Sequence, residues 1–216
     1  MPARSRRYDS SRRREQAARS RREVLAKARA LFLAQGFRAT TMASIAAAAG
    51  VSVETLYASW GSKTGIVEAL VREALRGDAD APPLERGEAV AAIQAEPSAR
   101  RALGLYGELL ARVQPQLAPV LRLLGEGAQS DAALAAILER NRRDRLEAMG
   151  RFAAHLAERG ALGEGVSRER ARDVLWTLNS PELYELLVEQ RGWSAAEYGS
   201  WVAETLASAL LDGAAP

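Results

Sequence analysis

The sequence predicts an all-α protein with two helical domains. Apolar residues recur at helical spacing along most of the 216-residue chain, whereas the strict apolar–polar alternation of a half-buried strand is nearly absent. Serine, threonine and glycine punctuate these segments at positions that suit helix caps. We expect a disordered, arginine-rich arm over 1–19, a first domain over 20–76, a connector over 77–97 and a second domain over 98–216.

Four helices are expected in the first domain. Ser20 and Glu23 form a capping-box pattern at the start of the first helix, and Gly36 is suited to end it. The hydroxyl of Thr40 or Thr41 is suited to cap the second helix and that of Ser52 the third, and Gly50 can take the left-handed turn between them. The expected ranges of the second, third and fourth helices are 41–49, 52–59 and 62–75.

The second domain is expected to follow a connector that contains three prolines and one short helix. Pro115 is expected to separate two helices, because proline removes a helical N–H donor. Ser180-Pro181 indicates an N-cap followed by proline in the first turn, and Ser194 with Glu197 forms a capping box. The expected helical ranges are 98–113, 116–128, 131–159, 167–179, 181–191 and 194–211.

Composition and charge narrow the class of protein. Hydrophobic residues make up 48% and charged residues 26% of the chain, which is typical of soluble proteins. The sequence has no cysteine and no apolar run of about 18 residues, so we expect a cytoplasmic protein without disulfides or membrane spans. Nine arginines and only two acidic residues within 1–22 indicate an anionic partner for the arm, although a solubilising tail would look the same.

Residues 45–67, IAAAAGVSVETLYASWGSKTGIV, predict two helices that cross closely. Ala46, Ala49 and Gly50 would allow the close crossing, and the short third helix has the size of a helix that enters a major groove. The hydroxyl-rich tip could bond phosphate oxygens, and a compact helical corner without DNA is the alternative. The phosphate-binding candidates are Thr41, Ser52, Thr55, Tyr57, Ser59 and Lys63.

Residues 40–71, TTMASIAAAAGVSVETLYASWGSKTGIVEALV, resemble the N-terminal domain of the TetR family of transcriptional regulators. The matching positions are Thr41, Ile45, Ala46, Ala49, Gly50, Val51, Ser52, Leu56, Tyr57, Trp60 and Lys63. Two positions depart from the family pattern. Trp60 replaces the usual phenylalanine, and Gly65 is expected to weaken the start of the fourth helix.

This resemblance implies roles for residues of the third helix and its neighbours. Thr41, Thr55, Tyr57 and Lys63 would hold phosphates, whereas Val53, Glu54 and Ala58 would face bases. Glu54 could accept a hydrogen bond from a cytosine amino group, or it could interact with the positive end of its own helix.

The second domain contains no pattern that indicates catalysis, a cofactor or a metal. His155 is the only histidine of the chain, and the acidic residues of the second domain mostly alternate with arginines. We therefore expect that the protein is not an enzyme. The resemblance implies a pocket for a small-molecule effector, with Leu103, Tyr106, Leu110, Phe152, Trp176 and Asn179 as candidates. It also implies a homodimer, with Val174, Leu175, Leu178, Trp201, Val202, Leu206 and Leu210 as candidates for the interface. Both sets could instead be ordinary core residues.

The resulting interpretation is a homodimeric regulator that binds double-stranded DNA at a palindromic operator. We expect a repressor that releases its operator when a small molecule binds the second domain. A transcriptional activator of the same fold, a non-regulatory protein that binds small ligands and a non-specific DNA binder are the alternatives.

Overall fold

The computed structural model describes residues 4–76 and 84–211, with side chains from Gln16 onward except that of Glu85. Every regular element in these ranges is helical, which confirms the predicted fold class. The α-helices are α1 (Arg4–Ala39), α2 (Met42–Ala49), α3 (Val53–Trp60), α4 (Lys63–Arg76), α5 (Glu88–Ala95), α6 (Ala99–Ala128), α7 (Ala132–Glu158), α8 (Arg168–Leu178), α9 (Pro181–Tyr184) and α10 (Ala195–Leu210). A 3₁₀-helix, η1 (Leu84–Arg86), precedes α5, and a π-helix, η2 (Glu185–Gln190), follows α9.

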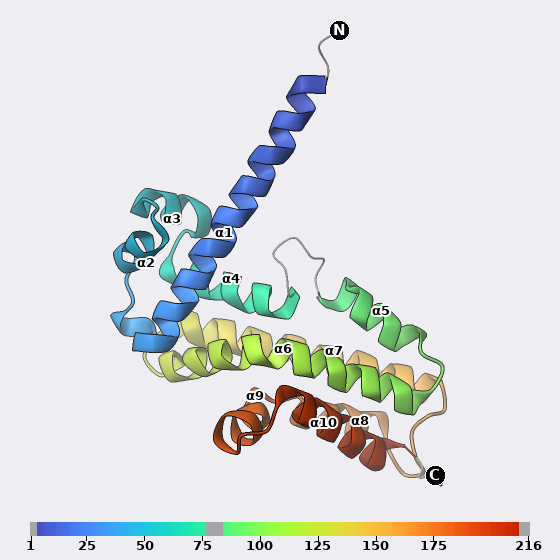
Figure 1. The fold of residues 1–216 in the computed structure, drawn as a ribbon. Helices are drawn as coiled ribbons and strands as arrows, with labels where there is room; N and C mark the ends of the chain where they lie inside the picture. The colour runs from blue at the N-terminus through green and yellow to red at the C-terminus, as the bar shows by residue number, and fades with distance from the viewer. Residues whose placement is uncertain (1–3, 77–83, 212–216) are drawn as a thin grey trace.

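Two long helices, α6 and α7, run side by side through the centre of the molecule (Figure 1). The first four helices gather at one end of this pair, and α5 packs on α6 toward the other end. α8, α9 and α10 cover a further face of the α6–α7 pair. α6 and α7 therefore connect the N-terminal helices with the rest of the molecule.

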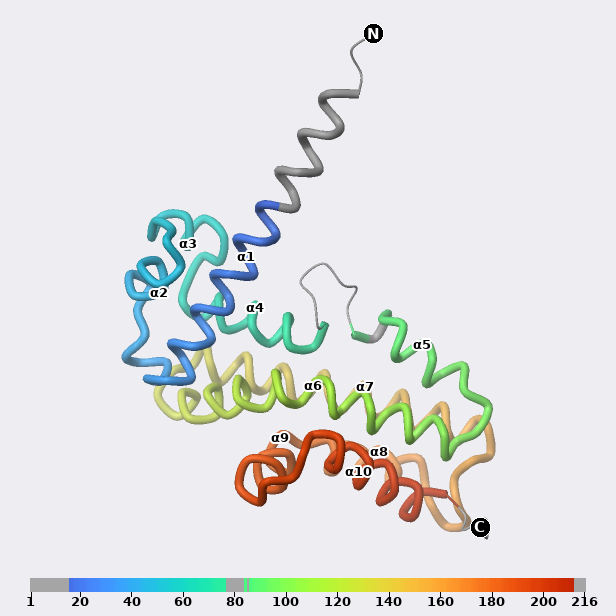
Figure 2. The backbone as a smooth tube through the Cα atoms, in the orientation of Figure 1, coloured from blue at the N-terminus to red at the C-terminus, as the bar shows by residue number. Residues whose placement is uncertain are grey.

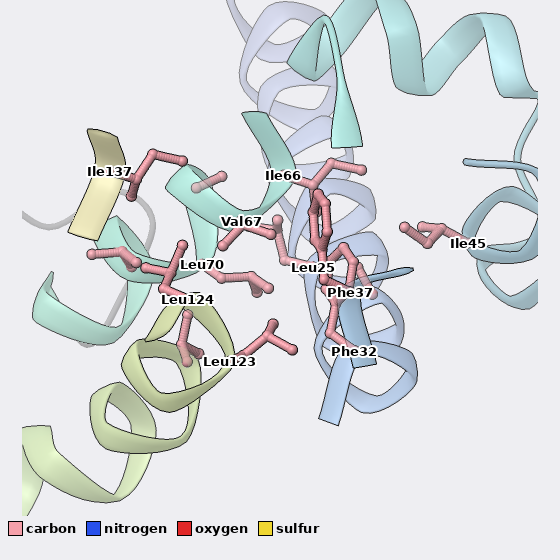
Figure 3. Close-up of a cluster of buried hydrophobic side chains, with 14 of the residues drawn as sticks. Leu25, Phe32, Phe37, Ile45, Ile66, Val67, Leu70, Leu123, Leu124 and Ile137 are labelled. Carbon is pink, nitrogen blue, oxygen red and sulfur yellow. The ribbon is translucent and has the colours of Figure 1, made fainter. Parts of the chain in front are cut away.

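The apolar interior forms two clusters, and the first joins the N-terminal helices to the central pair. Figure 3 shows Ile66, Val67 and Leu70 of α4 between side chains of α1 and of α6. Leu123 and Leu124, near the end of α6, belong to this cluster. The four N-terminal helices therefore share a core with the second half of α6 and do not form a core of their own.

α1 extends farther toward the N-terminus than expected. Ser20 lies inside α1 and does not cap its start, so the predicted start of the first helix at Ser20 was wrong. Figure 2 shows the coloured part of α1 as a helical coil that passes beside α4. Residues 4–19 contain neither glycine nor proline, and their arginines, alanines and glutamate favour helix, which explains why the helix does not start at the capping-box pattern. Gly36 has φ of 79° and ψ of 169°, so the expected break near residue 36 is confirmed.

α6 continues through both of its prolines, so the expected separation at Pro115 was wrong. Because Pro119 has no N–H, the carbonyl of Pro115 lacks its helical donor. Arg29 of α1 replaces that donor: its Nη2 atom lies 3.2 Å from the Pro115 oxygen and 3.2 Å from the Gln116 oxygen. The Nη1 atom of Arg29 also donates to the Gln116 side chain. A carbonyl freed by proline thus anchors α1 to α6.

The C-terminal helices pack against α6 within the same chain. Gly107 of α6 and Gly199 of α10 cross so closely that a Cβ atom added at Gly199 would lie 2.5 Å from the Gly107 oxygen. The stripe of α10 that was expected at a dimer interface points into the protomer, since Val202, Leu206 and Leu210 are at most 1% exposed.

The prediction of a dimer interface was therefore wrong for Leu175, Val202, Leu206 and Leu210, all of which are core residues. The close crossing at the two glycines buries this apolar stripe against α6, as the alternative of intramolecular packing expected. Val174, Leu178 and Trp201 keep partly exposed side chains. The predicted short helix in the connector is present as α5, and 77–83 lie outside the described residues.

Candidate nucleic-acid interface and adjoining cavity

The turn between α2 and α3 is built from side-chain caps and one glycine. Thr41 and Ser44 form a reciprocal capping box at the start of α2, with both hydrogen bonds at 3.0 Å. Gly50 ends α2 with φ of 66° and ψ of 30°, a left-handed conformation that side chains disfavour. Ser52 then caps α3 by accepting a hydrogen bond from the Thr55 N–H at 3.2 Å. These contacts fix the direction in which α3 leaves the turn.

Most of the residues predicted to touch DNA have exposed side chains on the surface of α2 and α3. Thr41 and Ser52 stand at the N-termini of α2 and α3. The hydroxyl hydrogen of Thr41 is not needed for capping, because the Thr41 oxygen acts as an acceptor, whereas the Ser52 hydroxyl lies 3.0 Å from the Thr55 hydroxyl. Tyr57 is 52% exposed, which leaves its hydroxyl available to a partner. Exposed side chains also occupy positions 54, 55, 58 and 59. The surface combines hydroxyl donors with the positive ends of two helices, and both features suit phosphate groups.

Two predicted base-contacting residues have additional roles in the fold. Val53 is only partly exposed and packs against the first apolar cluster. The pKa of Glu54 lies below its usual value, because its own backbone N–H and the Ser52 side chain stabilise the carboxylate. This agrees with the alternative that Glu54 interacts with the N-terminus of its own helix.

Lys63 lies in a different environment from the one expected of a phosphate contact. Its Nζ atom donates to the backbone oxygens of Phe37 and Thr40, both at 2.7 Å, and lies 4.0 Å from the centre of the Phe37 ring. Partial burial lowers the pKa of this ammonium group, and the charge of Asp131 acts in the opposite direction. Lys63 therefore joins the start of α4 to the segment between α1 and α2.

Gly65, which was expected to weaken the start of α4, allows a close approach instead. A Cβ atom at this position would collide with the backbone oxygen of Trp60, the last residue of α3. The N–H of Gly65 also donates to the Ser62 side chain at 3.0 Å. Glycine at position 65 thus sets how closely α3 and α4 meet.

A cavity of about 470 Å³ lies between α4, α5, α6 and α7. Tyr106, Leu110, Phe152 and Asn179, four of the residues predicted for an effector pocket, line it. Leu103 and Trp176, the other two predicted residues, do not line it.

Both of these residues have other partners in the fold. Leu103 is completely buried in the second apolar cluster, and Trp176 packs against the guanidinium of Arg145 with 4.6 Å between that group and the ring centre. Sequence reasoning also missed lining residues on α4 and the middle of α7, among them Val71, Leu75 and Met149. Their helical spacing indicates only an apolar face, which core residues share.

The family assignment rests on the segment that contains this turn. Residues 24–70 match the family model described as bacterial regulatory proteins, tetR family. This chain contains the DNA-binding domain of the TetR family at residues 24–70. It is therefore a DNA-binding transcriptional regulator and not an enzyme, and α2 and α3 form the helix-turn-helix of its DNA-binding domain.

Solved structures agree with the TetR fold over nearly the whole chain. NalD, the secondary repressor of the MexAB-OprM multidrug efflux pump in Pseudomonas aeruginosa, is 19% identical with a TM-score of 0.67, and the match covers 91% of this chain and 99% of NalD. A complex of SmeT with triclosan is 19% identical with a TM-score of 0.66, covering 90% of this chain and 93% of SmeT. SmeT is the repressor of the Stenotrophomonas maltophilia multidrug efflux pump SmeDEF.

GusR from Salmonella enterica is 19% identical with a TM-score of 0.63, and the match covers 88% of this chain and 95% of GusR. No curated protein sequence matches the chain. Within the two described ranges, no helix of this chain is long and apolar enough to cross a bilayer.

Replacement of Lys63 by methionine tests whether the ammonium group contacts DNA. We expect Lys63→Met to weaken DNA binding about tenfold, because the anchored turn loosens, while the slope of log affinity against log salt concentration stays unchanged. Affinity would be measured by fluorescence anisotropy with one duplex at several salt concentrations.

Tyr57→Phe is the matched control, since it removes a single exposed hydroxyl of α3 and leaves the Lys63 contacts intact. If the slope of log affinity against log salt concentration falls by about one per subunit in Lys63→Met, Lys63 contacts a phosphate as the sequence predicted.

Proposed function

We propose that this TetR-family protein is a homodimeric repressor that binds a palindromic operator and releases it when a small molecule fills the cavity. α3 would enter the major groove of each half-site, with Glu54 and Ala58 near base edges and with Thr41, Ser52, Thr55, Tyr57 and Ser59 near phosphates. Lys63 would hold the turn in position. Such a protein would act in the cytoplasm, where the DNA is.

The position of α4 carries this proposal. Val71 and Leu75, in the second half of α4, line the cavity. Ile66 and Val67, one to two turns earlier in α4, are completely buried in the cluster that also contains Phe32 of α1. A ligand that moves the second half of α4 would therefore move the helix-turn-helix, because cores are close-packed and transmit displacement.

The anchor between α1 and α6 supports a second path of coupling. Val113 and Leu117 of α6 line the cavity, and Pro115 and Gln116 between them hold Arg29 of α1. A bound molecule that displaces this part of α6 would act on α1 through Arg29. Two helices of the DNA-binding domain thus have contacts that lead to the cavity.

The character of the cavity supports a small, largely apolar effector. Its volume falls within the usual range of about 300–1,000 Å³ for small-molecule sites, and side chains such as Leu110, Val113 and Phe152 provide apolar walls. NalD and SmeT, which share this fold, are repressors of multidrug efflux pumps, and SmeT forms a complex with triclosan. We propose the same type of response for this chain.

The proposed dimer would use the outward faces of α8 and α10. Val174, Leu178 and Trp201 remain partly exposed there, next to the fully buried residues of the same helices. A two-fold pair would place two copies of α3 on one side of the dimer, as a palindromic site requires.

Filling the cavity with a tryptophan side chain tests the proposed function. Ala148 of α7 lines the cavity, so we expect Ala148→Trp to weaken binding of the neutral dye N-phenyl-1-naphthylamine by more than tenfold. In the wild-type protein the dye should lower the affinity for duplex DNA, and this effect should disappear in Ala148→Trp. Dye fluorescence and anisotropy of a labelled duplex measure the two effects.

Ala136→Trp is the matched control, since Ala136 is an exposed residue of the same helix and lies outside the cavity lining. This variant should behave as the wild type in both measurements. Dye binding that survives in Ala148→Trp, or a dye that binds the wild type without changing DNA affinity, would contradict the proposal.

A further inference from the structure

A chain of polar side chains lies at the wall of the cavity that faces α9 and α8. Gln114 of α6 is only 1% exposed, and its Nε2 atom donates to the backbone oxygen of Asn179 at 3.1 Å and to the Asn179 side-chain oxygen at 3.3 Å. A backbone carbonyl can only accept hydrogen bonds, so these contacts fix the orientation of the Gln114 amide. Its Oε1 atom must therefore face away from Asn179.

The Oε1 atom of Gln114 is buried without a hydrogen-bond partner among the described residues. Burying an amide oxygen unpaired is unfavourable, and most such atoms in proteins find a donor. Because Gln114 lines the cavity, a bound molecule is in a position to provide that donor.

Donors of two neighbouring side chains are already directed elsewhere. The Tyr106 hydroxyl donates to the sulfur of Met149 at 3.1 Å, and the Asn179 Nδ2 atom donates to the same sulfur at 3.8 Å. All four side chains of this group, Tyr106, Gln114, Met149 and Asn179, line the cavity. The Gln114 Oε1 atom is therefore an unused acceptor of this wall, beside one Asn179 N–H that these contacts do not use.

The charge around the cavity limits the kind of donor that fits. Its lining includes five arginines and only two carboxylates, those of Glu68 and Asp144, and Glu68 pairs with Arg140 at 3.3 Å. A cationic ligand would be repelled by this excess of positive charge. The matching donor is therefore an uncharged hydroxyl or N–H group.

We propose that the effector is an apolar molecule with an uncharged hydroxyl or N–H group that donates to the Gln114 Oε1 atom. The apolar part would pack against Leu110, Val113 and Phe152, and the donor would complete the polar group formed by Gln114 and Asn179. This inference rests on the proposed function, because it names the class of molecule that fills the same cavity.

Two probes that differ in one donor test the inference. 2-Naphthol carries a hydroxyl group, and 2-methoxynaphthalene replaces it with an ether that cannot donate. We expect the wild-type protein to bind 2-naphthol about tenfold more tightly than the ether, although the ether is the more hydrophobic compound. Equilibrium dialysis of full-length protein against each probe measures both affinities.

Gln114→Leu should reduce this preference to about twofold or less while binding of the ether is kept. Gln94→Leu is the matched control, because Gln94 also lines the cavity but is exposed on α5, and it should keep the wild-type preference. If Gln114→Leu does not fold, the inference is still tested by whether the wild type and Gln94→Leu both bind 2-naphthol more tightly than 2-methoxynaphthalene.

The outcomes separate this inference from the proposed function. Equal binding of both probes by the wild type, or a preference that survives in Gln114→Leu, would overturn the inference and leave the cavity as an apolar binding site. Failure of the wild type to bind either probe would contradict the inference together with the proposed function.

Discussion

Replacement of Gly65 by alanine should weaken DNA binding by about 100-fold. The added Cβ would collide with the backbone oxygen of Trp60, which cannot turn aside as a flexible side chain could. Relief of such overpacking typically costs about 1–3 kcal/mol, and shifting α3 relative to α4 would misplace both copies of α3 in a dimer. A loss of about 1.4 kcal/mol in each half-site corresponds to 100-fold for two. Anisotropy titration with an operator duplex measures this loss.

Gly125→Ala provides the comparison for Gly65→Ala. Gly125 lies in α6, where an added Cβ would meet no atom within 4 Å. Alanine favours helix over glycine, so this variant should bind DNA normally and unfold at the same or a higher temperature. Wild-type DNA affinity in Gly65→Ala would show that the contact between α3 and α4 can relax without moving α3.

Gly107→Ala should lower the stability of the whole protein. An added Cβ would collide with the backbone oxygen of Gly199, where α6 and α10 cross. Separation of these helices would loosen the second apolar cluster around Val202 and Leu206. We expect a loss of about 1–3 kcal/mol, partly offset by the higher helix propensity of alanine, and a fall of about 2–9 °C in the melting temperature. Thermal denaturation followed by circular dichroism measures it.

Gly104→Ala is the control for this prediction, because Gly104 lies one turn away in the same helix with no atom within 4 Å of an added Cβ. Its melting temperature should stay unchanged or rise slightly. Equal melting temperatures for Gly104→Ala and Gly107→Ala would show that the helix crossing is not a tight constraint.

The helix-turn-helix could be predicted in detail because its signals are local. Thr41 and Ser52 cap helices within three residues of themselves, and Gly50 adopts the left-handed turn that its lack of a side chain allows. The role of Lys63 could not be predicted in the same way. Its partners Phe37 and Thr40 lie more than twenty positions away in the chain, so only the folded arrangement brings them together.

The behaviour of the prolines shows how tertiary contacts change a local expectation. Pro119 leaves the Pro115 carbonyl without a helical donor, and this lack of a donor is visible in the sequence. The side chain that supplies the donor, Arg29, is one of many arginines in the chain and is distinguished only by its position in the fold. α6 therefore continues where the sequence alone predicts a break.

Apolar stripes at helical spacing identify a buried face but not its partner. Val202, Leu206 and Leu210 were expected at a dimer interface, and they pack inside the protomer because glycines let α10 approach α6. The same ambiguity applies to Leu103, a core residue, and Leu110, which lines the cavity. Pocket positions and core positions carry the same types of apolar residue, so only the folded packing of α4, α5, α6 and α7 shows which residues line the cavity.

Selection of binding sites from a pool of random duplexes tests the central claim most directly. The wild-type protein, incubated with the pool at low salt, should enrich an inverted repeat whose half-sites are centred about 10 bp apart or at a multiple of that spacing. The Gly65→Ala variant should enrich it much less. Failure of the wild-type protein to enrich any sequence, or enrichment of a site without two-fold symmetry, would contradict the account of paired α3 helices at a palindromic operator.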